Sequence, residues 1–185
     1  MTHDPRALLL AASLALAGPL SGCVPAYVGP QGGPTAKLVL RQDLPPGWTP
    51  KFQIFEEPHA CTYPARLVQS DGSASTSTTL RAGPLATLSV FVSNQRKVCT
   101  VVSSFYPVEK HTYLLVAGVR DDRCYLGLLD ATNGDEPVVE KSFFQRRFTG
   151  SCPAPTPAEL SGRGLKADGS APPPSLDDFK SLLEP

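Results

Sequence analysis

The sequence has few histidines, a single tryptophan and no excess of basic residues, whereas catalytic and nucleic-acid-binding proteins commonly depend on such residues. Only three histidines and one tryptophan occur in 185 residues, and 17 basic residues are balanced by 17 acidic ones, which gives a net charge of zero. A neutral chain provides no field that would attract nucleic acid or an anionic surface. We therefore expect no nucleic-acid partner, and the length suits one domain with extensions.

Motifs for catalysis and for metal binding are also missing. Hydrolysis by a serine or cysteine nucleophile needs a histidine base, and beyond the N-terminal segment only His59 and His111 are available. Neither stands beside a G-x-S-x-G or S-x-x-K motif, and no C-x-x-C pair occurs. We interpret His111 as a solvated residue of a turn, and we predict a protein that is not an enzyme and holds no metal or cofactor.

The N-terminal segment predicts export. An apolar run from Ala7 to Ala17 is too short to cross a membrane and is typical of a signal peptide. It leads to Leu20-Ser21-Gly22-Cys23, a leucine and two small residues before a cysteine. These four residues resemble the lipobox of bacterial lipoproteins. The alternative is an ordinary secretory signal that leaves Cys23 as a plain thiol or a disulfide partner.

The lipobox resemblance implies a modification and a location. In bacterial lipoproteins the precursor is cut after the residue that corresponds to Gly22, and the cysteine receives a diacylglyceryl group and a further acyl chain such as palmitate. Several acyl chains make such an anchor effectively permanent. The next residue is Val24 rather than the aspartate that retains enterobacterial lipoproteins in the inner membrane. The resemblance therefore implies the periplasmic face of the outer membrane.

Four further cysteines predict two disulfide bonds. Their number is even, and the predicted compartment is oxidising. If the segments around Cys99 and Cys124 flank one central strand, they lie about 9.6 Å apart, beyond the limit of about 7 Å for a bridge. We therefore favour Cys61 with Cys99 and Cys124 with Cys152, and the other two pairings remain open.

The region from Lys37 to Phe148 is patterned as β-structure. Apolar and polar residues alternate there, and turn residues interrupt them about every ten positions. Between Leu85 and Ser93, three alternating apolar side chains can share a buried face, whereas Tyr113 to Val119 is apolar throughout, as in a strand buried on both faces. Further strands are expected at Lys37–Arg41, Lys51–Phe55, Arg66–Gln69, Thr76–Arg81, Val98–Tyr106, Cys124–Leu129 and Val138–Phe148.

These segments predict an all-β fold of about eight strands. Turns at Pro107–Lys110, Asp121–Asp122 and Asn133–Gly134 suggest three successive hairpins in one meander. We expect an antiparallel two-sheet sandwich, similar to immunoglobulin or transthyretin domains, with a small closed barrel as the alternative. The expected boundaries are a signal peptide at 1–22, the lipidated cysteine and linker at 23–36, the sandwich at 37–152, a Pro-rich linker at 153–174, and a short amphipathic helix and tail at 175–185.

The central region also resembles a group of small proteobacterial lipoproteins with cysteine-containing β domains. The resemblance covers about half the chain and supports the sandwich and the lipidation, but it implies no activity. The residues that carry it are Phe55, Cys61, Ala82-Gly83, Thr87-Leu88, Cys99, Ser104-Phe105-Tyr106-Pro107, Tyr113 and Cys124.

Several polar clusters have a functional and a simpler interpretation. Glu56, Glu57 and His59 could ligate a metal but are explained by a polar loop, and Asp130, Asn133, Asp135 and Glu136 lack the spacing of a calcium loop and fit a hairpin turn. Arg146-Arg147 could bind an anion, although paired arginines commonly keep a sheet edge soluble. Trp48 is expected to cover the sandwich as a plug, with a carbohydrate platform as the alternative.

The C-terminal segment predicts a short helix whose apolar face consists of Leu176, Phe179 and Leu183. Such a helix is too short to be stable alone, so it docks on a partner or on its own sandwich, or it stays unfolded. Together these features predict a lipid-anchored, non-catalytic envelope protein that binds another envelope protein or has a structural role. The alternative is a small-ligand-binding or enzyme-inhibitor module, and a hydrolase is the third hypothesis.

Overall fold

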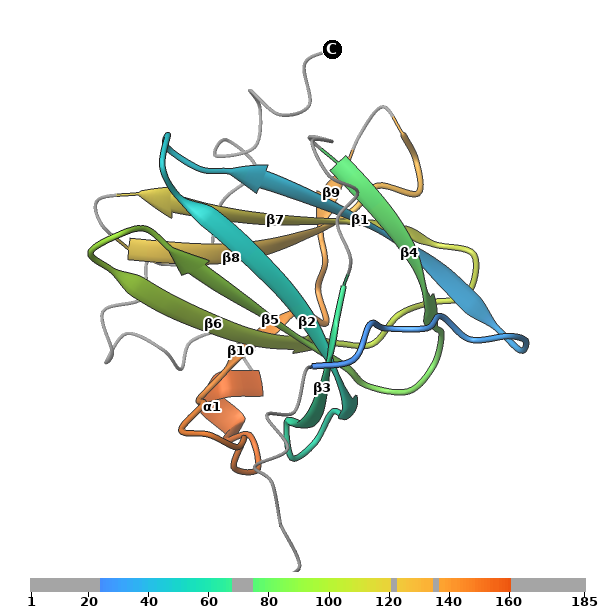
Figure 1. Cartoon of the computed structure of the whole chain (residues 1–185). Coiled ribbons are helices and arrows are strands. Elements are labelled where there is room, and N and C mark those ends of the chain that lie inside the picture. Colours follow the sequence, from blue (N-terminus) through green and yellow to red (C-terminus); the bar gives the residue numbers. More distant parts are fainter. Residues whose placement is uncertain (1–23, 68–74, 121–122, 135–136, 161–185) are drawn as a thin grey trace, which may run out of the picture.

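The computed structural model describes residues 24–67, 75–120, 123–134 and 137–160. Two five-stranded sheets face each other and are not closed into a barrel (Figure 1). This confirms the predicted two-sheet sandwich. In the described ranges, no helix is both long and apolar enough to cross a membrane.

Each sheet combines strands from distant parts of the chain. Sheet A has the order β10-β6-β5-β2-β3 and sheet B the order β4-β1-β7-β8-β9. The strands of sheet A are β2 (Thr49–Glu57), β3 (Thr62–Arg66), β5 (Ala86–Ser93), β6 (Val98–Phe105) and β10 (Phe144–Arg146). Those of sheet B are β1 (Thr35–Asp43), β4 (Ser75–Arg81), β7 (Thr112–Arg120), β8 (Arg123–Asp130) and β9 (Val138–Val139). One short helix, α1 (Pro157–Leu160), follows them within the predicted Pro-rich linker.

The core lies between the two sheets and is filled by alternating side chains. Leu88, Val90 and Val92 of β5 are all completely buried, as their alternation predicted. Phe105 of β6 packs edge-on against Tyr113 of β7, with ring centroids 5.0 Å apart. Trp48 is half-buried against this core, which agrees with its expected role as a plug.

Two predicted connections differ from the observed ones. The turn at 107–110 does not close a hairpin, because β6 lies in sheet A while β7 lies in sheet B, where it runs parallel to β1. The predicted strand from Val138 to Phe148 is also interrupted. The Glu140 carboxylate accepts hydrogen bonds from the amide and hydroxyl of Ser142, both at 2.8 Å, and this turn sends β9 and β10 to different sheets.

Strand β7 is buried on both faces, as expected for a central strand. Its outer face contributes Leu114 and Val116 to a second apolar cluster on sheet B. Opposite Gly118, the ring of Tyr125 occupies the space that a Cβ atom would need. The Tyr125 hydroxyl reaches across the sheet and donates a 2.7 Å hydrogen bond to Asp43, which fixes the ring over the glycine.

The sandwich contains two disulfides, and their predicted pairing is wrong. Cys61 bonds to Cys152 and Cys99 bonds to Cys124, with Cα–Cα distances of 5.3 and 6.3 Å. The prediction assumed that Cys99 and Cys124 flank one central strand of a single sheet. They lie instead on β6 and β8, which face each other across the sandwich, so the distance between alternate strands of a sheet does not apply.

Candidate functional site

The polar residues singled out at Glu56, Glu57 and His59 do not gather into one site in the structure. His59 is exposed, and the Glu57 carboxylate accepts a 2.7 Å hydrogen bond from the hydroxyl of Thr62. Within the described ranges, no group of three metal-ligating side chains comes together. Cys23, Asp135, Glu136, Leu176, Phe179 and Leu183 lie outside the described residues.

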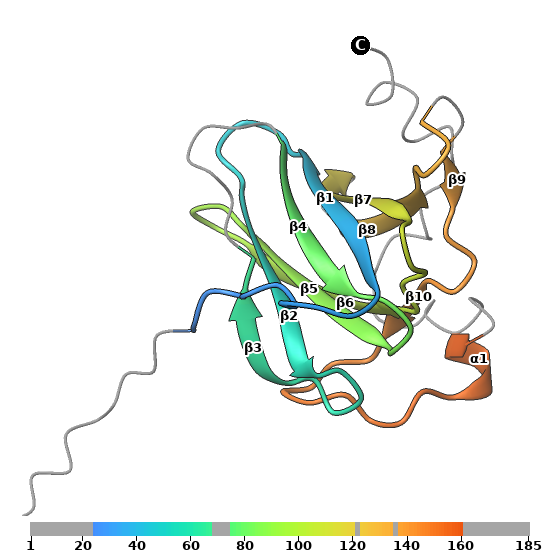
Figure 2. The same cartoon turned by 90° about the vertical axis from the view of Figure 1, so that its right-hand side faces the viewer.

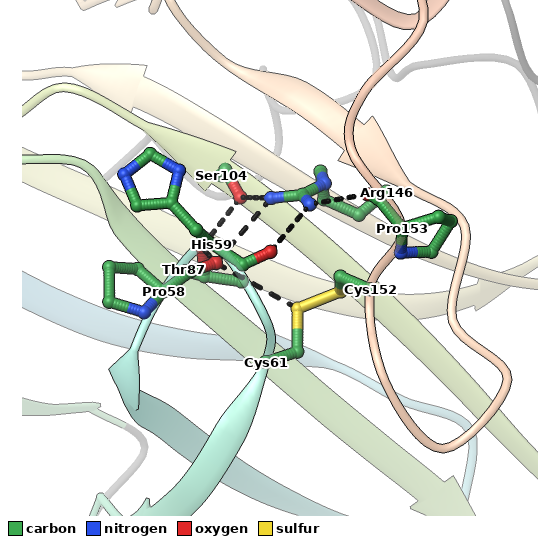
Figure 3. The surroundings of a disulfide bond; sticks show 8 residues. All are labelled: Pro58, His59, Cys61, Thr87, Ser104, Arg146, Cys152 and Pro153. Atoms are coloured by element: carbon green, nitrogen blue, oxygen red, sulfur yellow. Dashed lines mark hydrogen bonds between the residues drawn. A yellow bond between two sulfur atoms is a disulfide. The ribbon is translucent and has the colours of Figure 1, made fainter.

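The first polar cluster is centred on Arg146, which is 4% exposed (Figure 3). Its guanidinium donates hydrogen bonds to the backbone carbonyls of His59 at 3.0 Å, Pro153 at 2.9 Å and Pro58 at 3.5 Å. The Cys61–Cys152 disulfide joins the same two loops. Arg146 and the disulfide together therefore fix the loop after β2 to the segment after β10, a cluster that we call the Arg146 clamp.

Neighbouring charges oppose the effect of burial on the pKa values of Arg146 and Glu159. Burial lowers the pKa of the Arg146 guanidinium, while the carboxylate of Glu159 counteracts this effect. Burial raises the pKa of Glu159, but hydrogen bonds from Thr156 and the charges of Arg147 and Arg146 outweigh it, so that the pKa lies below its ordinary value. The two terminal nitrogens of the Arg146 guanidinium donate their hydrogen bonds to backbone carbonyls and to the hydroxyl of Ser104, which favours a structural role.

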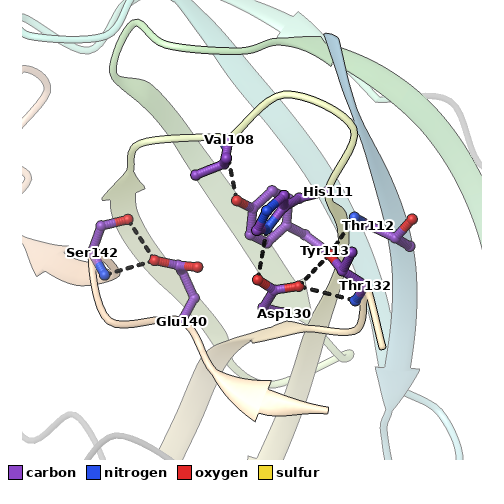
Figure 4. Close-up of polar contacts among 8 residues, drawn as sticks. All are labelled: Val108, His111, Thr112, Tyr113, Asp130, Thr132, Glu140 and Ser142. Atoms are coloured by element: carbon purple, nitrogen blue, oxygen red, sulfur yellow. Dashed lines mark hydrogen bonds and ion pairs between the residues drawn. The ribbon is translucent and has the colours of Figure 1, made fainter. Parts of the chain in front are cut away.

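The second polar cluster pairs His111 with Asp130 (Figure 4). His111 Nδ1 and Asp130 Oδ2 are 2.7 Å apart, and the side chains are 33% and 18% exposed. Burial would raise the pKa of Asp130, but hydrogen bonds from the amide and hydroxyl of Thr132 and from His111 outweigh it and lower the pKa. The predicted solvated turn histidine is thus held by an aspartate of the next strand.

The His111–Asp130 pair connects two strand ends. His111 precedes β7 and Asp130 ends β8, while the imidazole stacks on the ring of Tyr113 with centroids 6.0 Å apart. Although an aspartate and a histidine are two members of a hydrolytic triad, no serine, threonine or cysteine of the described ranges hydrogen-bonds to this ring. What the contact does in the structure is to join the start of β7 to the end of β8 at one end of sheet B.

A polar hollow of about 330 Å³ lies beside His111 on sheet B. Lys37 and Lys110 provide two cations at its wall, and the neighbouring residues are mostly threonines. In the register of the sheet, Thr79, Lys37 and Thr112 lie side by side on three adjacent strands. This arrangement suits an anionic group with hydroxyl partners, and sequence reasoning missed it because its residues are distant along the chain.

A further surface feature is apolar and lies at the β9 end of sheet B. Val138 and Val139 are 53% and 40% exposed, and β9 ends the strand order of its sheet. The nearby crossover carries Tyr106 and Val108, which are 48% and 49% exposed. The Tyr106 amide donates a hydrogen bond to the hydroxyl of Ser142, which joins this crossover to the turn that follows β9. We call these four residues the β9 edge patch.

The residues that follow Cys23 are attached to the opposite side of the sandwich. The Arg66 amide of β3 donates a 2.7 Å hydrogen bond to the carbonyl of Pro25, and the Tyr27 amide donates a 2.8 Å bond to the carbonyl of Arg66. The Tyr27 hydroxyl reaches β4 and donates to the Thr79 carbonyl at 3.1 Å. Residues 25–29 therefore form a strap across the open side between the two sheets, which we call the N-terminal strap.

Comparison with known proteins gives no further guide to the site. No family model, curated protein or solved structure matches the chain.

Proposed function

We propose that the chain is the precursor of an outer-membrane lipoprotein that is cleaved after Gly22 and lipidated on Cys23. The proposal is supported by the order of residues in Leu20-Ser21-Gly22-Cys23 at the end of an apolar run. The two disulfides of the sandwich suit the oxidising periplasm, since such bonds rarely persist in a reducing cytosol.

We further propose that the anchored sandwich is a non-catalytic module that binds another envelope protein. The observation that carries this proposal is an exposed apolar sheet edge beside a core that is already filled. Val138 and Val139 lie on an edge strand with exposed side chains, whereas the large side chains between the sheets are completely buried. An edge strand can pair with a strand of a partner, and its apolar side chains add contact area.

The anchor is tested by replacing Cys23. In cells fed labelled palmitate, the parent incorporates label and Cys23→Ser accumulates as an unlabelled precursor that retains residues 1–22. Cys61→Ala/Cys152→Ala is the matched control, because it removes two other cysteines, which form a disulfide of the folded domain, and leaves the processing site intact. Equal labelling of Cys23→Ser and the parent would rule out lipidation at this residue.

The partner surface is tested by a photo-crosslinking amino acid at position 139. The control position is Gln95, which is also exposed but lies in the turn between β5 and β6. In intact envelopes we expect a discrete cross-linked species from position 139 that is weak from position 95 and is lost when Val138 is changed to lysine. Identical patterns from both positions would contradict the proposed interface.

The predicted partner-docking face of Leu176, Phe179 and Leu183 remains a proposal. The structure dictates how it is tested, because removing all residues after Cys152 would delete the Pro153 carbonyl that Arg146 binds. A truncation after Leu160 preserves the Arg146 clamp. If the C-terminal segment docks on a partner, this variant keeps its melting temperature and loses the cross-linked species. A melting temperature several degrees lower would assign the segment to the domain itself.

The hollow beside His111 favours the ligand-binding alternative. Two lysines and several hydroxyl groups at its wall suit a phosphate, sulfate or carboxylate group. A Lys37→Gln/Lys110→Gln variant would then bind inorganic phosphate or a sulfated sugar more weakly than the parent. Equal binding by both proteins, measured by calorimetry, would eliminate this alternative.

A further inference from the structure

We infer that the anchor holds the β3 side of the sandwich directly against the membrane surface, so that the β9 edge patch faces away from it. The inference rests on the proposed lipidation of Cys23. It follows from the position at which the chain first contacts the folded domain. That contact is made by Pro25, whose carbonyl accepts the hydrogen bond from the amide of Arg66.

The first step concerns the reach of the tether. Only Val24 separates Cys23 from Pro25, and two residues of extended chain span at most about 7 Å. The polar headgroup layer on each side of a bilayer is itself about 5 to 8 Å thick. A diacylglyceryl group on Cys23 would lie at the inner boundary of that layer. The N-terminal strap would therefore lie within the headgroups or directly on them.

The second step concerns the attachment of the strap. Ala26 forms a parallel bridge with Arg66, and the Tyr27 amide bonds to the same residue. On the other sheet, the Tyr27 hydroxyl bonds to β4, and the ring packs against the core. Because these contacts join the strap to both sheets, the strap cannot act as a flexible linker without breaking them. The short tether therefore restricts the orientation of the whole sandwich.

The third step concerns the surface that this orientation places at the membrane. The strap carries Val28, which is 74% exposed, and β3 carries Tyr63, which is 66% exposed. An exposed valine and tyrosine suit the boundary between headgroups and acyl chains, where amphipathic and apolar groups are favoured. Arg66 and Arg81 are exposed on the two strands that the strap joins, and cations there attract anionic headgroups.

The fourth step concerns the opposite side. Figure 2 shows the strap and β3 at one side of the sandwich and β9 at the other. With the β3 side at the bilayer, Val138 and Val139 face the periplasm, where a soluble partner or a partner from another membrane layer can reach them. The distance between anchor and patch is thus set by the width of the folded sandwich.

The test uses tryptophan fluorescence of the purified lipidated protein in vesicles that contain brominated phospholipids, which quench at short range. Trp48 is changed to phenylalanine, and a new tryptophan is placed at Val28 or, as the matched control, at Val138. We expect several-fold quenching of the tryptophan at 28 and none at 138. Inserting ten Gly and Ser residues between Val24 and Pro25 should remove the quenching at 28 while the protein stays on the vesicles.

Each outcome decides between the two proposals. A mass spectrum without lipid on Cys23 would overturn the proposed anchor, and the inference with it. If the protein is lipidated but the tryptophan at 28 is not quenched, the inference is overturned and the anchor stands. The same holds if the variants with tryptophan at 28 and at 138 are quenched equally. If Trp48→Phe fails to fold, the same substitutions are read with Trp48 retained, and its signal in the parent is the baseline.

Discussion

The two disulfides differ in the length of chain that they close, and this difference predicts unequal contributions to stability. Cys61–Cys152 closes a loop of 91 residues, whereas Cys99–Cys124 closes one of 25. In the chain-entropy treatment, a bridge restricts the unfolded chain, and its loss destabilises by about 4.6 kcal/mol for the longer loop and about 3.5 kcal/mol for the shorter one. We expect the double variant Cys61→Ala/Cys152→Ala to be the less stable by about 1 kcal/mol.

The comparison is suited to urea unfolding followed by fluorescence and circular dichroism. Alanine is chosen because Cys61 and Cys152 are 3% and 7% exposed, and a buried serine hydroxyl would add its own cost. With a slope of about 2 kcal/mol per molar urea, the two variants should differ by about 0.5 M in midpoint. In Cys61→Ala/Cys152→Ala, Arg146 can still bind the Pro153 carbonyl, so the two loops of the Arg146 clamp keep this contact without the disulfide. A larger loss in Cys99→Ala/Cys124→Ala, or a peptide map that links Cys61 to Cys99, would refute the reasoning.

Three other substitutions test the polar clusters and the close packing of sheet B. Arg146→Met leaves the backbone carbonyls of His59 and Pro153 without this donor, while the Pro58 carbonyl keeps its bond from Thr87, and should cost about 3 kcal/mol in unfolding free energy. Arg96→Met on an exposed turn should stay within about 0.5 kcal/mol, and equal effects of the two substitutions would contradict the clamp. Thr132→Val removes the hydroxyl bond to Asp130, so carboxyl NMR should show its pKa rising, while Thr132→Ser leaves it unchanged. Folding lowers the pKa of Asp130, so the ionised carboxylate stabilises the folded protein at pH values above its unfolded pKa. This stabilisation is lost as the pH falls through the folded-state pKa. Thr132→Val and Thr132→Ser should therefore have similar unfolding free energies at low pH. Gly118→Ala places a Cβ atom against the ring of Tyr125 and should cost about 1 to 3 kcal/mol in unfolding free energy by overpacking. The control is Gly134→Ala, whose Cβ atom would meet nothing within 4 Å. An equal loss of stability in both variants would argue against steric overlap at Gly118.

The strands themselves could be predicted because their signal is local. Alternation in β5 placed Leu88, Val90 and Val92 in the core, and the continuous apolar run of β7 indicated burial on both faces. Both patterns follow from the two-residue repeat of a strand and its exposure to one or two layers. Neither requires knowledge of which strands are neighbours.

The arrangement of the strands could not be predicted in the same way. A turn at Pro107–Lys110 has the same composition whether the chain returns within a sheet or crosses to the other one. The choice depends on contacts between remote residues, such as the packing of Phe105 on Tyr113 and the pairing of β7 with β1. The wrong disulfide pairing has the same origin, because a distance within one sheet was applied to cysteines that face each other across two.

The polar clusters show the same limit at the level of single residues. His111 and Asp130 were each identified, but as members of separate turns, because nothing in the local sequence indicates that β7 and β8 bring them within 2.7 Å. Arg146 was assigned to a soluble sheet edge, which is the ordinary place for adjacent arginines. Its burial depends on three carbonyls supplied by the loop at Pro58 and by Pro153, and backbone carbonyls leave no mark on a sequence.

The proposed membrane orientation depends on a feature of the same kind. Composition assigned residues 23–36 to a linker because prolines and glycines are frequent there, yet residues 25–27 hydrogen-bond to β3. A true linker would uncouple the domain from its anchor, so that any surface could face the bilayer. If Cys23 is lipidated as proposed, a strap that begins two residues later converts the lipid anchor into an orienting contact. Under this proposal the β9 edge patch is accessible for a geometric reason, because the N-terminal strap and the exposed edge belong to opposite sides of one sandwich.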